Sequence, residues 1–494
     1  MSKLKLFLTI VVIGISAFTH LYRIDKTFIF QNDEGRDALI AYRMIETRSP
    51  VLLGPETSVG NMYLGPFYYF LMVPALSLSS LDPVGPAVMV AILGIATTGL
   101  LILLGKKHFN FPTGLYAGIF YSLSPVMVHY SRSSWNPNVI PFFTILLFFC
   151  IPFRKLKHLL AFGALTGIIF QLHYVALIIP TILIIRELYL SFNLESSKAL
   201  MVKICWIILG FLITSAPFWL FELRHEFINS QAFLDYLMSK SSGGDSSGYP
   251  PYFMRLWGNI KLLVLGIIGS SALIDQSVSW IVWATGGLTI LLYWLRHKGV
   301  YTYVVIFSLL IISILKENIN VHYVAYLFPI VSLMIGRMLS EKGITKIPTL
   351  ILVFALIAPF SSSLKYNLFD LESSSAKRAK ETAEYIVKEA AEKSYNVVNY
   401  STSSTATILY YLATSTNPPK NDDQPLLFVI CEDALCSEDV LTTKNLFLNG
   451  PSHPTLISYL GYHPRLSTEN QRTMVKNEWV TYDVHVATVM VNPW

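Results

Sequence analysis

Charged residues are scarce in this sequence compared with soluble proteins. Only 14% of its 494 residues are Asp, Glu, Lys or Arg, whereas a soluble domain usually carries about 25%. Hydrophobic residues make up 53% of the chain, and the mean hydropathy is +0.51. This balance excludes an ordinary soluble enzyme and predicts a protein that lies mostly in a membrane.

Motifs for several other chemistries are also missing. The sequence has no GxxxxGK[ST] loop, so nothing indicates nucleotide hydrolysis. No Asp-X-Asp triplet occurs in a predicted outer loop, so no cofactor is expected, and a divalent metal is possible but not indicated. Acids within the hydrophobic runs are nearly absent, which argues against a proton-coupled transporter. The net charge of +6 comes largely from short Lys/Arg clusters between these runs, a pattern that orients membrane segments and does not indicate a nucleic-acid partner.

Cysteine is rare, with four residues in the chain. Cys150 and Cys205 lie in apolar runs and are expected to be inert packing residues. Cys431 and Cys436 lie in the polar tail, where a disulfide across a short loop is reasonable in an oxidising exterior. No further Cys or His cluster accompanies this pair, so a zinc site is not predicted.

The hydrophobic runs predict about 11 membrane spans, or about 13 if two ambiguous segments also cross. The ambiguous segments are residues 63–81 and 258–273, which we interpret as interfacial helices because this choice keeps the Lys/Arg clusters on one side. Residues 4–21 lack a small-residue cleavage site and are expected to be an uncleaved first span. We therefore expect a multi-pass plasma-membrane (inner-membrane) protein with a cytoplasmic N-terminus and an outer C-terminus.

Composition changes sharply near residue 365. We expect an all-α polytopic membrane domain over residues 1–364 and a small extracytoplasmic α/β domain over residues 365–494. In this tail, residues 376–393 read as a charged helix, and residues 396–400 and 426–431 read as strands. The apolar residues of the helix recur on one stripe: Ala379, Ala383, Ile386 and Ala390.

The most informative charges follow the first hydrophobic run. Asp33 and Glu34 are adjacent, and Arg36 comes two residues later. Residues 33–47 are predicted to be a helix with Asn32 as its N-cap. In a functional interpretation, Asp33 is a general base that takes a proton from an acceptor hydroxyl, and Glu34 supports it. In the alternative interpretation, the two acids only complement the helix dipole.

A second outer loop, residues 131–138, has the sequence Ser-Arg-Ser-Ser-Trp-Asn-Pro-Asn. Arg132 is a candidate to grip a phosphate, because a guanidinium matches that geometry. Trp135 is a candidate to stack on a sugar and Asn136 to donate a hydrogen bond to it. The alternative is a proline-capped turn with an interfacial Trp.

Two His-Tyr pairs stand at predicted outer ends of spans. They are His173-Tyr174 and His322-Tyr323. Both pairs are candidates to contact a phosphate or sugar in one pocket, and each alone also fits an ordinary interfacial aromatic pair.

Together these features resemble the bacterial members of the protein O-mannosyltransferase superfamily, which include the lipid A aminoarabinose transferase and the family 39 glycosyltransferases. The resemblance rests on the first span, the outer Asp-Glu helix start, the segment Gly65-Pro66-Phe67-Tyr68-Tyr69 and the second outer loop with Asn-Pro, and it covers residues 4–339. It implies a GT-C fold, a polyprenyl-phosphate sugar as donor and an inverting transfer.

The resemblance also implies roles for single residues. The family's Asp-Glu pair falls on Asp33 and Glu34. A second-loop carboxylate of the aminoarabinose transferases falls near Asn136, and the family's Lys-Pro or His-Pro becomes Gly65-Pro66. The phosphate contact is therefore expected from Arg36, Arg132 or His322.

The leading hypothesis is a membrane glycosyltransferase that moves one sugar from a polyprenyl-phosphate donor to a hydroxyl of a lipid, glycan or protein at the outer face. One alternative is a lipid or glycan transporter (flippase) without transferase activity, which predicts charges within the spans. Another is a sensor whose tail binds a ligand, which would not need so many spans.

Overall fold

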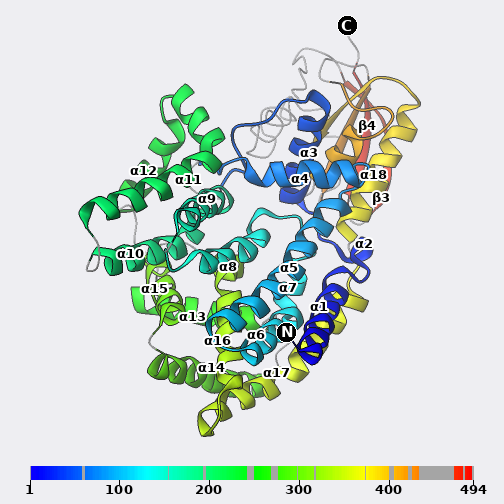
Figure 1. Cartoon of the computed structure of the whole chain (residues 1–494). Helices are drawn as coiled ribbons and strands as arrows, with labels where there is room; N and C mark the ends of the chain where they lie inside the picture. Colours follow the sequence, from blue (N-terminus) through cyan, green and yellow to red (C-terminus); the bar gives the residue numbers. More distant parts are fainter. Residues whose placement is uncertain are drawn as a thin grey trace. The chain divides into compact units, whose positions relative to one another are not determined.

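The computed structural model describes residues 2–57, 62–153, 155–192, 196–241, 250–268, 276–297, 299–315, 319–372, 374–399, 405–420, 426–432, 472–481 and 484–491. Helices dominate this part of the chain (Figure 1). The chain divides into two compact units. Unit 1 comprises Met1–Ile24, Pro50–Leu71 and Ala87–Leu371, and unit 2 comprises Asp25–Ser49, Met72–Pro86 and Glu372–Trp494.

Unit 1 is built from helices. They are α1 (Lys3–Leu21), α5 (Val84–His108), α6 (Phe111–Leu123), α7 (Pro125–Tyr130), η1 (Asn136–Val139), α8 (Ile140–Cys150), α9 (Leu156–Leu172), η2 (Tyr174–Leu177), α10 (Ile178–Phe192), α11 (Ser197–Arg224), α12 (Ile228–Ser241), α13 (Tyr252–Ile268), α14 (Gln276–Arg296), α15 (Val300–Ile312), η5 (Val321–Tyr323), η6 (Ala325–Leu327), α16 (Phe328–Ser340), η7 (Ile344–Lys346), α17 (Ile347–Lys365) and the π-helical turn η8 (Tyr366–Asp370). Within it, α9 packs along α11, and α6 packs against both α1 and α16.

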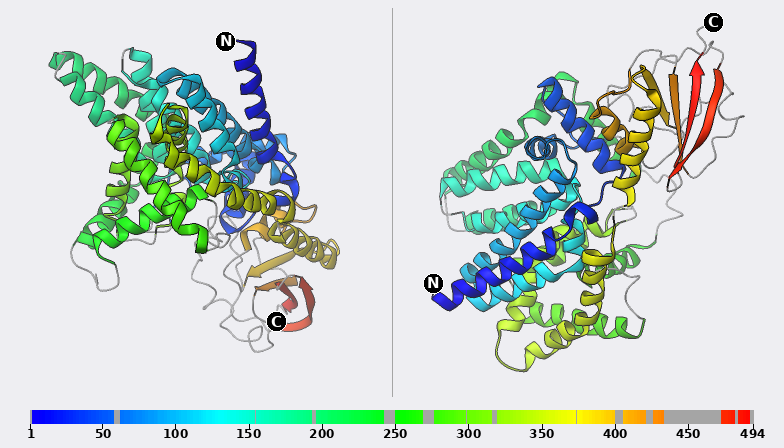
Figure 2. Two further views of the ribbon diagram at one scale, coloured as in Figure 1. Left: turned by 90° about the horizontal axis from the view of Figure 1, so that it is seen from below. Right: turned by 90° about the vertical axis from the view of Figure 1, so that its right-hand side faces the viewer.

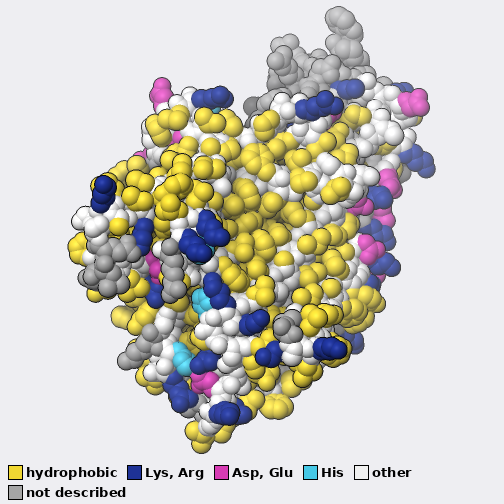
Figure 3. Space-filling model, viewed as in Figure 1, with side chains coloured by type: hydrophobic (Ala, Val, Ile, Leu, Met, Phe, Trp, Pro, Cys, Tyr) yellow, Lys and Arg dark blue, Asp and Glu magenta, His cyan; other side chains and the backbone are white. Residues whose placement is uncertain are grey.

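Several of these helices are suited to a bilayer. Among the described residues, four are long and apolar enough to cross a membrane, or up to five if a bent pair counts as one span. The four are Lys3–Leu21, Val84–His108, Tyr174–Phe192 and Ser197–Arg224, and shorter apolar helices of 10–17 residues accompany them. Hydrophobic side chains cover much of the visible surface (Figure 3). The chain is a multi-pass membrane protein; the larger predicted number of spans and the predicted orientation stay predictions.

The first ambiguous segment contains a short helix, α4 (Phe67–Leu78), with Pro74 inside it. Its 12 residues extend about 18 Å, less than the hydrocarbon core of about 30 Å. By itself α4 is therefore too short to cross. In the second ambiguous segment, α13 begins at Tyr252, six residues before the predicted start.

Unit 2 contains α3 (Asn32–Thr47), α18 (Ser374–Ala390), α19 (Thr405–Ala413) and a four-stranded sheet. The strands are β1 (Tyr395–Asn399), β2 (Leu426–Glu432), β3 (Arg472–Thr481) and β4 (Val484–Val491), in the order β1-β2-β4-β3 (Figure 2). β1 pairs with β2 in parallel, with Val397 opposite Phe428, and the other pairs are antiparallel. The short helix α2 (Ile24–Thr27) precedes α3.

The helix and the two strands predicted for the tail correspond to α18, β1 and β2. The predicted helical stripe is buried on α18: Ala379, Ala383, Ile386 and Ala390 are each at most 3% exposed. β1 and β2 begin and end within one residue of the two predicted strands. An independent domain that starts at residue 365 stays a prediction.

The cysteines give a mixed result. Cys150 is free and buried, as expected for a packing residue. Cys205 is free but exposed on α11, so the packing role predicted for it is wrong. The predicted disulfide between Cys431 and Cys436 lies outside the described residues, because Cys436 is not among them.

Candidate functional site

The first predicted site lies at the start of α3. The helix begins one residue earlier than expected, and the capping residue is Gln31 and not Asn32. Glu34 is 5% exposed, and its Oε2 accepts a hydrogen bond of 3.1 Å from the backbone N–H of Gln31. This bond satisfies a donor that precedes the first helical turn. Glu34 therefore has a structural task that its sequence position alone did not reveal.

Asp33 and Arg36 form an ion pair in the same turn. Arg36 Nη1 lies 2.8 Å from Asp33 Oδ1, and Arg36 Nε and Nη2 both lie 2.9 Å from Asp37 Oδ1. The side chain of Asp33 is 46% exposed, whereas that of Asp37 is fully buried. Asp33 is thus the accessible carboxylate of this turn, and Arg36 holds it on one side.

α3 is supported by α19, which the sequence analysis missed. A Cβ on Gly35 would lie 2.6 Å from the backbone nitrogen of Thr407, so only glycine allows the two helices to approach this closely. The buried ring of Phe30 packs edge-on against Tyr410 and Tyr411, with ring centroids 5.8 and 5.9 Å away. The start of α3 is therefore held in place by packing against α19.

In unit 1 three residues of the two predicted His-Tyr pairs, His173, His322 and Tyr323, come together with Trp135. The ring of His322 lies 4.6 Å from Trp135, 6.2 Å from His173 and 4.5 Å from Tyr323, and His173 lies 5.0 Å from Tyr323 (centroid distances). We call His173, His322, Trp135 and Tyr323 the aromatic cluster. Residues 135, 173 and 322 are far apart in sequence, so the predicted convergence of these side chains is a property of the fold.

His173 in the aromatic cluster is uncharged around neutral pH. Burial, and then the nearby His322, lower the pKa of His173 to about 3. A neutral imidazole donates through one ring nitrogen and accepts through the other. In His173 the acceptor is Nδ1, which binds the backbone N–H of Val175 at 3.3 Å, so Nε2 carries the proton. His173 is therefore suited to donate to a sugar hydroxyl and not to neutralise a phosphate.

The other two predicted contacts of the second loop are engaged with the protein. Asn136 is buried and donates a 2.7 Å hydrogen bond to the carbonyl oxygen of Leu172, next to His173. Arg132 is 1% exposed, and its Nη2 donates to the carbonyl oxygen of Thr19 at 2.7 Å. Burial, and then the nearby Arg23, lower the pKa of Arg132 to about 10, so it stays charged at neutral pH. Asn136 thus orients the turn that carries His173, and Arg132 anchors the loop to α1.

A hydrogen-bonded network that the sequence analysis missed lies beside Tyr174. The Tyr174 hydroxyl donates to the carbonyl oxygen of Tyr63 at 2.5 Å, and Asn229 Nδ2 donates to the same oxygen at 3.1 Å. Glu222, fully buried, accepts from the backbone N–H of Asn229 and Ser230. Glu222 at the end of a long apolar helix was the available signal, since a buried acid needs partners.

The predicted Pro-aromatic segment begins two residues after Tyr63, whose carbonyl oxygen belongs to this network. A Cβ on Gly65 would lie 2.2 Å from the side chain of Gln171, which is buried two residues before His173. This close approach requires glycine. Packing against Gln171 therefore accounts for the glycine before Pro66.

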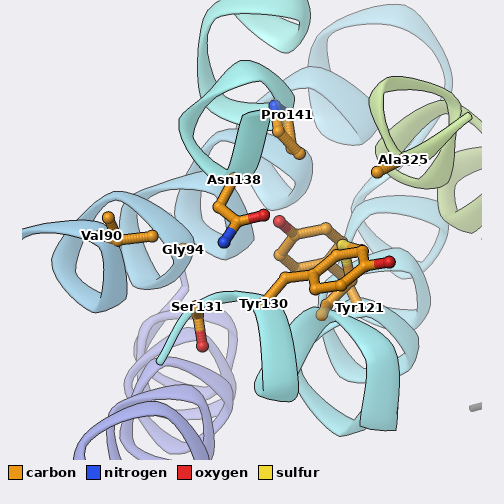
Figure 4. A pocket seen from close by; sticks show the side chains of 9 residues that line it. Val90, Gly94, Tyr121, Tyr130, Ser131, Asn138, Pro141 and Ala325 are labelled. Carbon is orange, nitrogen blue, oxygen red and sulfur yellow. The ribbon is translucent and has the colours of Figure 1, made fainter. Parts of the chain in front are cut away.

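A small pocket lies beside the second loop, residues 131–138. It is lined by Val90, Gly94, Tyr121, Met127, Tyr130, Ser131, Asn138, Pro141 and Ala325. The Asn138 side chain points toward the rings of Tyr121 and Tyr130 (Figure 4). The pocket thus shares the ends of the second loop, Ser131 and Asn138, but none of the predicted contacts.

No group of three or more His, Cys, Asp or Glu side chains that could hold a metal ion occurs in the part of the chain that the structure describes.

Comparison with known proteins gives the fold. No family model and no curated protein matches the sequence. Among solved structures, the chain is similar to ArnT from Cupriavidus metallidurans bound to undecaprenyl phosphate, with a TM-score of 0.58 and 11% identity over 98% of this chain and 97% of ArnT. ArnT in the apo state gives 0.58 and 12% over the same shares.

A second similar protein is the oligosaccharyltransferase from Archaeoglobus fulgidus in the apo form. Its TM-score is 0.50 at 12% identity, over 84% of this chain and 64% of that one. The fold of this chain is therefore of the GT-C type, as the sequence predicted. Its likeness to ArnT, the lipid A aminoarabinose transferase, extends along nearly the whole of both chains.

Proposed function

We propose that this chain is a membrane glycosyltransferase that moves one sugar from a polyprenyl-phosphate donor to a hydroxyl of a lipid, glycan or protein at the outer face of the plasma membrane. The observation that carries the proposal is the full-length similarity of its fold to ArnT, a structure that contains undecaprenyl phosphate. A fold alone does not determine an activity, so the roles proposed below rest on the geometry of the residues.

Asp33 is the proposed general base. A base must reach the hydroxyl whose proton it takes, and of the three acids at the start of α3 only Asp33 has a substantially exposed side chain. Glu34 supports it by holding the first turn of α3 through Gln31. Arg36 fixes the orientation of the Asp33 carboxylate.

The proposed reaction is a single displacement. Asp33 takes the proton of the acceptor hydroxyl while that oxygen forms a bond to the anomeric carbon of the sugar. The bond between this carbon and the phosphate oxygen breaks, and its electron pair leaves with the polyprenyl phosphate. Attack from the face opposite the leaving phosphate inverts the anomeric configuration. A soluble cofactor is not part of this scheme.

The aromatic cluster is the proposed contact for the donor sugar, with Tyr174 and Asn136 behind it. Aromatic rings offer flat apolar faces. The neutral His173 accepts from the backbone N–H of Val175 through Nδ1, so its Nε2–H is the donor that it offers to a hydroxyl. Arg36, Arg132 and His322 stay the proposed contacts for the donor phosphate. Arg36 binds two carboxylates and Arg132 binds a backbone carbonyl, so in this proposal the phosphate is bound beside those partners by the five N–H donors of a guanidinium.

The test uses the full chain in liposomes that contain undecaprenyl-phosphate-linked sugars and a panel of lipid, glycan and peptide acceptors. We expect acceptor-dependent release of undecaprenyl phosphate, and NMR of the product should show the inverted anomer. Movement of the lipid-linked sugar between leaflets without its consumption would contradict the proposal and favour a flippase. A product with retained configuration would contradict the single displacement.

A further inference from the structure

A set of cationic side chains lies at one end of the helices of unit 1. We call Lys3, Lys5, Lys106, Lys107, Arg296, Arg337 and Lys342 the basic rim. All are exposed except Arg337, which is partly buried. In Figure 3 Lys and Arg side chains gather over the lower part of the visible face, and Asp and Glu are few among them. None of these residues belongs to the proposed transferase site.

Hydrogen bonds join the helix ends that carry the basic rim. At the end of α5, Lys107 donates to the carbonyl oxygen of Phe149 on α8 (3.2 Å), and His108 Nδ1 lies 2.8 Å from the Tyr301 hydroxyl on α15. The hydroxyls of Thr113 on α6 and Ser340 on α16 lie 2.7 Å apart. The basic rim is therefore one surface and not a set of unrelated loops.

This surface lies away from the aromatic cluster. In α8 and α16 the residues of the rim contacts are at the C-terminal ends, whereas η1 and η5, which carry Asn136 and His322, precede the N-terminal ends. The basic rim and the aromatic cluster are thus at opposite ends of the same two helices.

Aromatic rings position three of the cations. Lys5 Nζ lies 5.7 Å from the centroid of Phe111, Lys107 Nζ lies 5.3 Å from Phe149, and the Arg337 guanidinium carbon lies 5.1 Å from Phe109. A cation at this distance over a ring face is attracted by it. The charges are therefore held at the ends of the helices, with their aliphatic stems along apolar surface.

Among the described residues, the carboxylate of Glu341 lies within the basic rim, and it is already paired. Glu341 lies 3.3 Å from Arg296, 3.4 Å from Arg337 and 2.6 Å from His297. It orients these two arginines but leaves the surface strongly positive, because the lysines outnumber it. An anion is the partner that such a surface attracts.

The neighbours of the cations indicate which anion. Leu4 is 64% exposed between Lys3 and Lys5, Leu103 is 55% exposed one turn before Lys107, and Ile344 is 77% exposed beyond Lys342. Exposed leucine and isoleucine next to lysine match the boundary between acyl chains and headgroups, not an aqueous phosphate site.

We propose that the basic rim binds the phosphate headgroups of anionic phospholipids and that these lipids stabilise the folded chain. This goes beyond the usual bias of lysine and arginine that orients membrane proteins during insertion. Orientation alone needs only the number of charges on one side, whereas the proposal requires bound anionic lipid on the finished protein.

The experiment measures lipid retained by the purified full chain after equilibration with equal amounts of phosphatidylglycerol and phosphatidylcholine, using native mass spectrometry. We expect the wild type to retain phosphatidylglycerol in at least tenfold preference. The variant K106Q/K107Q/R296Q/K342Q keeps Lys3 and Lys5 and should lose most of this preference. The matched control K377Q/K380Q/K388Q/K393Q removes the same charge from α18 and its C-terminal flank in unit 2 and should keep it.

A second measurement does not depend on whether the variant folds. The Tm of the wild-type chain should be higher in phosphatidylglycerol than in phosphatidylcholine at low salt, and the difference should shrink at high salt, because salt screens exposed charges. Equal retention of the two lipids by the wild type, or equal loss in rim and control variants, would overturn the proposal. Displacement of the lipid by millimolar inorganic phosphate would also overturn it and identify a site for free phosphate.

Discussion

The start of α3 in unit 2 is formed by charged side chains, whereas the aromatic cluster in unit 1 is formed by rings. At the start of α3, the carboxylates of Asp33 and Asp37 share one guanidinium, that of Arg36. In the aromatic cluster four rings approach within about 4.5–6.2 Å of one another, and burial keeps His173 neutral. The first arrangement is suited to moving a proton, and the second is suited to binding the apolar face of an uncharged sugar ring.

The two regions are also held in place by different kinds of contact. The carboxylates are set by bonds within one helical turn, so neighbouring residues in the sequence determine them. The aromatic cluster combines three distant segments and depends on Asn136, Gln171 and the network around Asn229. A substitution at the start of α3 should therefore act on the chemical step, and one in the aromatic cluster should act on donor binding.

The largest expected effect is that of Asp33→Asn. It keeps the size of the side chain but removes the base, so the rate of sugar transfer should fall about 10²- to 10⁴-fold. The measurement is release of polyprenyl phosphate under single-turnover conditions. Asp25→Asn, which changes an exposed acid of α2, is the matched control and should leave the rate unchanged. Transfer by Asp33→Asn at near the wild-type rate would remove Asp33 from the mechanism.

A smaller effect is expected from Trp135→Ala. It removes the ring 4.6 Å from His322 and should raise the KM for the donor about fivefold, because an aromatic contact contributes about 1 kcal/mol. The turnover number should change less than KM. Trp294→Ala removes a partly exposed ring on α14 and serves as the control. A fall in turnover with an unchanged KM would contradict the division between binding and chemistry.

The smallest effect concerns pH. The folded chain keeps His173 neutral down to a pKa of about 3, whereas the unfolded chain takes up this proton below about pH 6.5. The unfolded state therefore binds more protons between these values, and His173 lowers the free energy of unfolding as the pH falls from 6.5, by at most about 1.4 kcal/mol per unit.

Denaturant unfolding at pH 7.5 and 5.5 measures this contribution. The loss of stability between the two values should be about 1 kcal/mol smaller in His173→Gln than in the wild type. An identical loss in both proteins would show that His173 is already protonated, or equally accessible to protons, in the folded chain.

Much of this organisation could be predicted from the sequence where the signal is local. The acid pair predicted the start of α3 to within one residue, and the alanine stripe predicted the buried face of α18. Both follow from helical periodicity and dipole complementation, which act over a few residues. The GT-C fold was predicted from the resemblance and is confirmed by the similarity to ArnT.

Signals that depend on distant contacts could not be found in this way. Asn229 is one polar residue at the start of α12, and its bonds to Tyr63 and Tyr174 exist only after folding. α19 was missed because its approach to α3 depends on Gly35, some 370 residues earlier in the sequence. The burial of Arg132 was missed for the same reason, because its partner Thr19 belongs to α1.

The missing Cβ of Gly35 has a wider consequence for how the chain can be shortened. Thr407 occupies the space that any other side chain would need at that position, so α3 and α19 pack closely only with glycine there. A truncation after residue 371 would strip the proposed base of its backing and expose the aromatic ring of Phe30 to water. The terminal segment supports the helix that carries the proposed base, and its removal should abolish the proposed transfer even with the membrane helices intact.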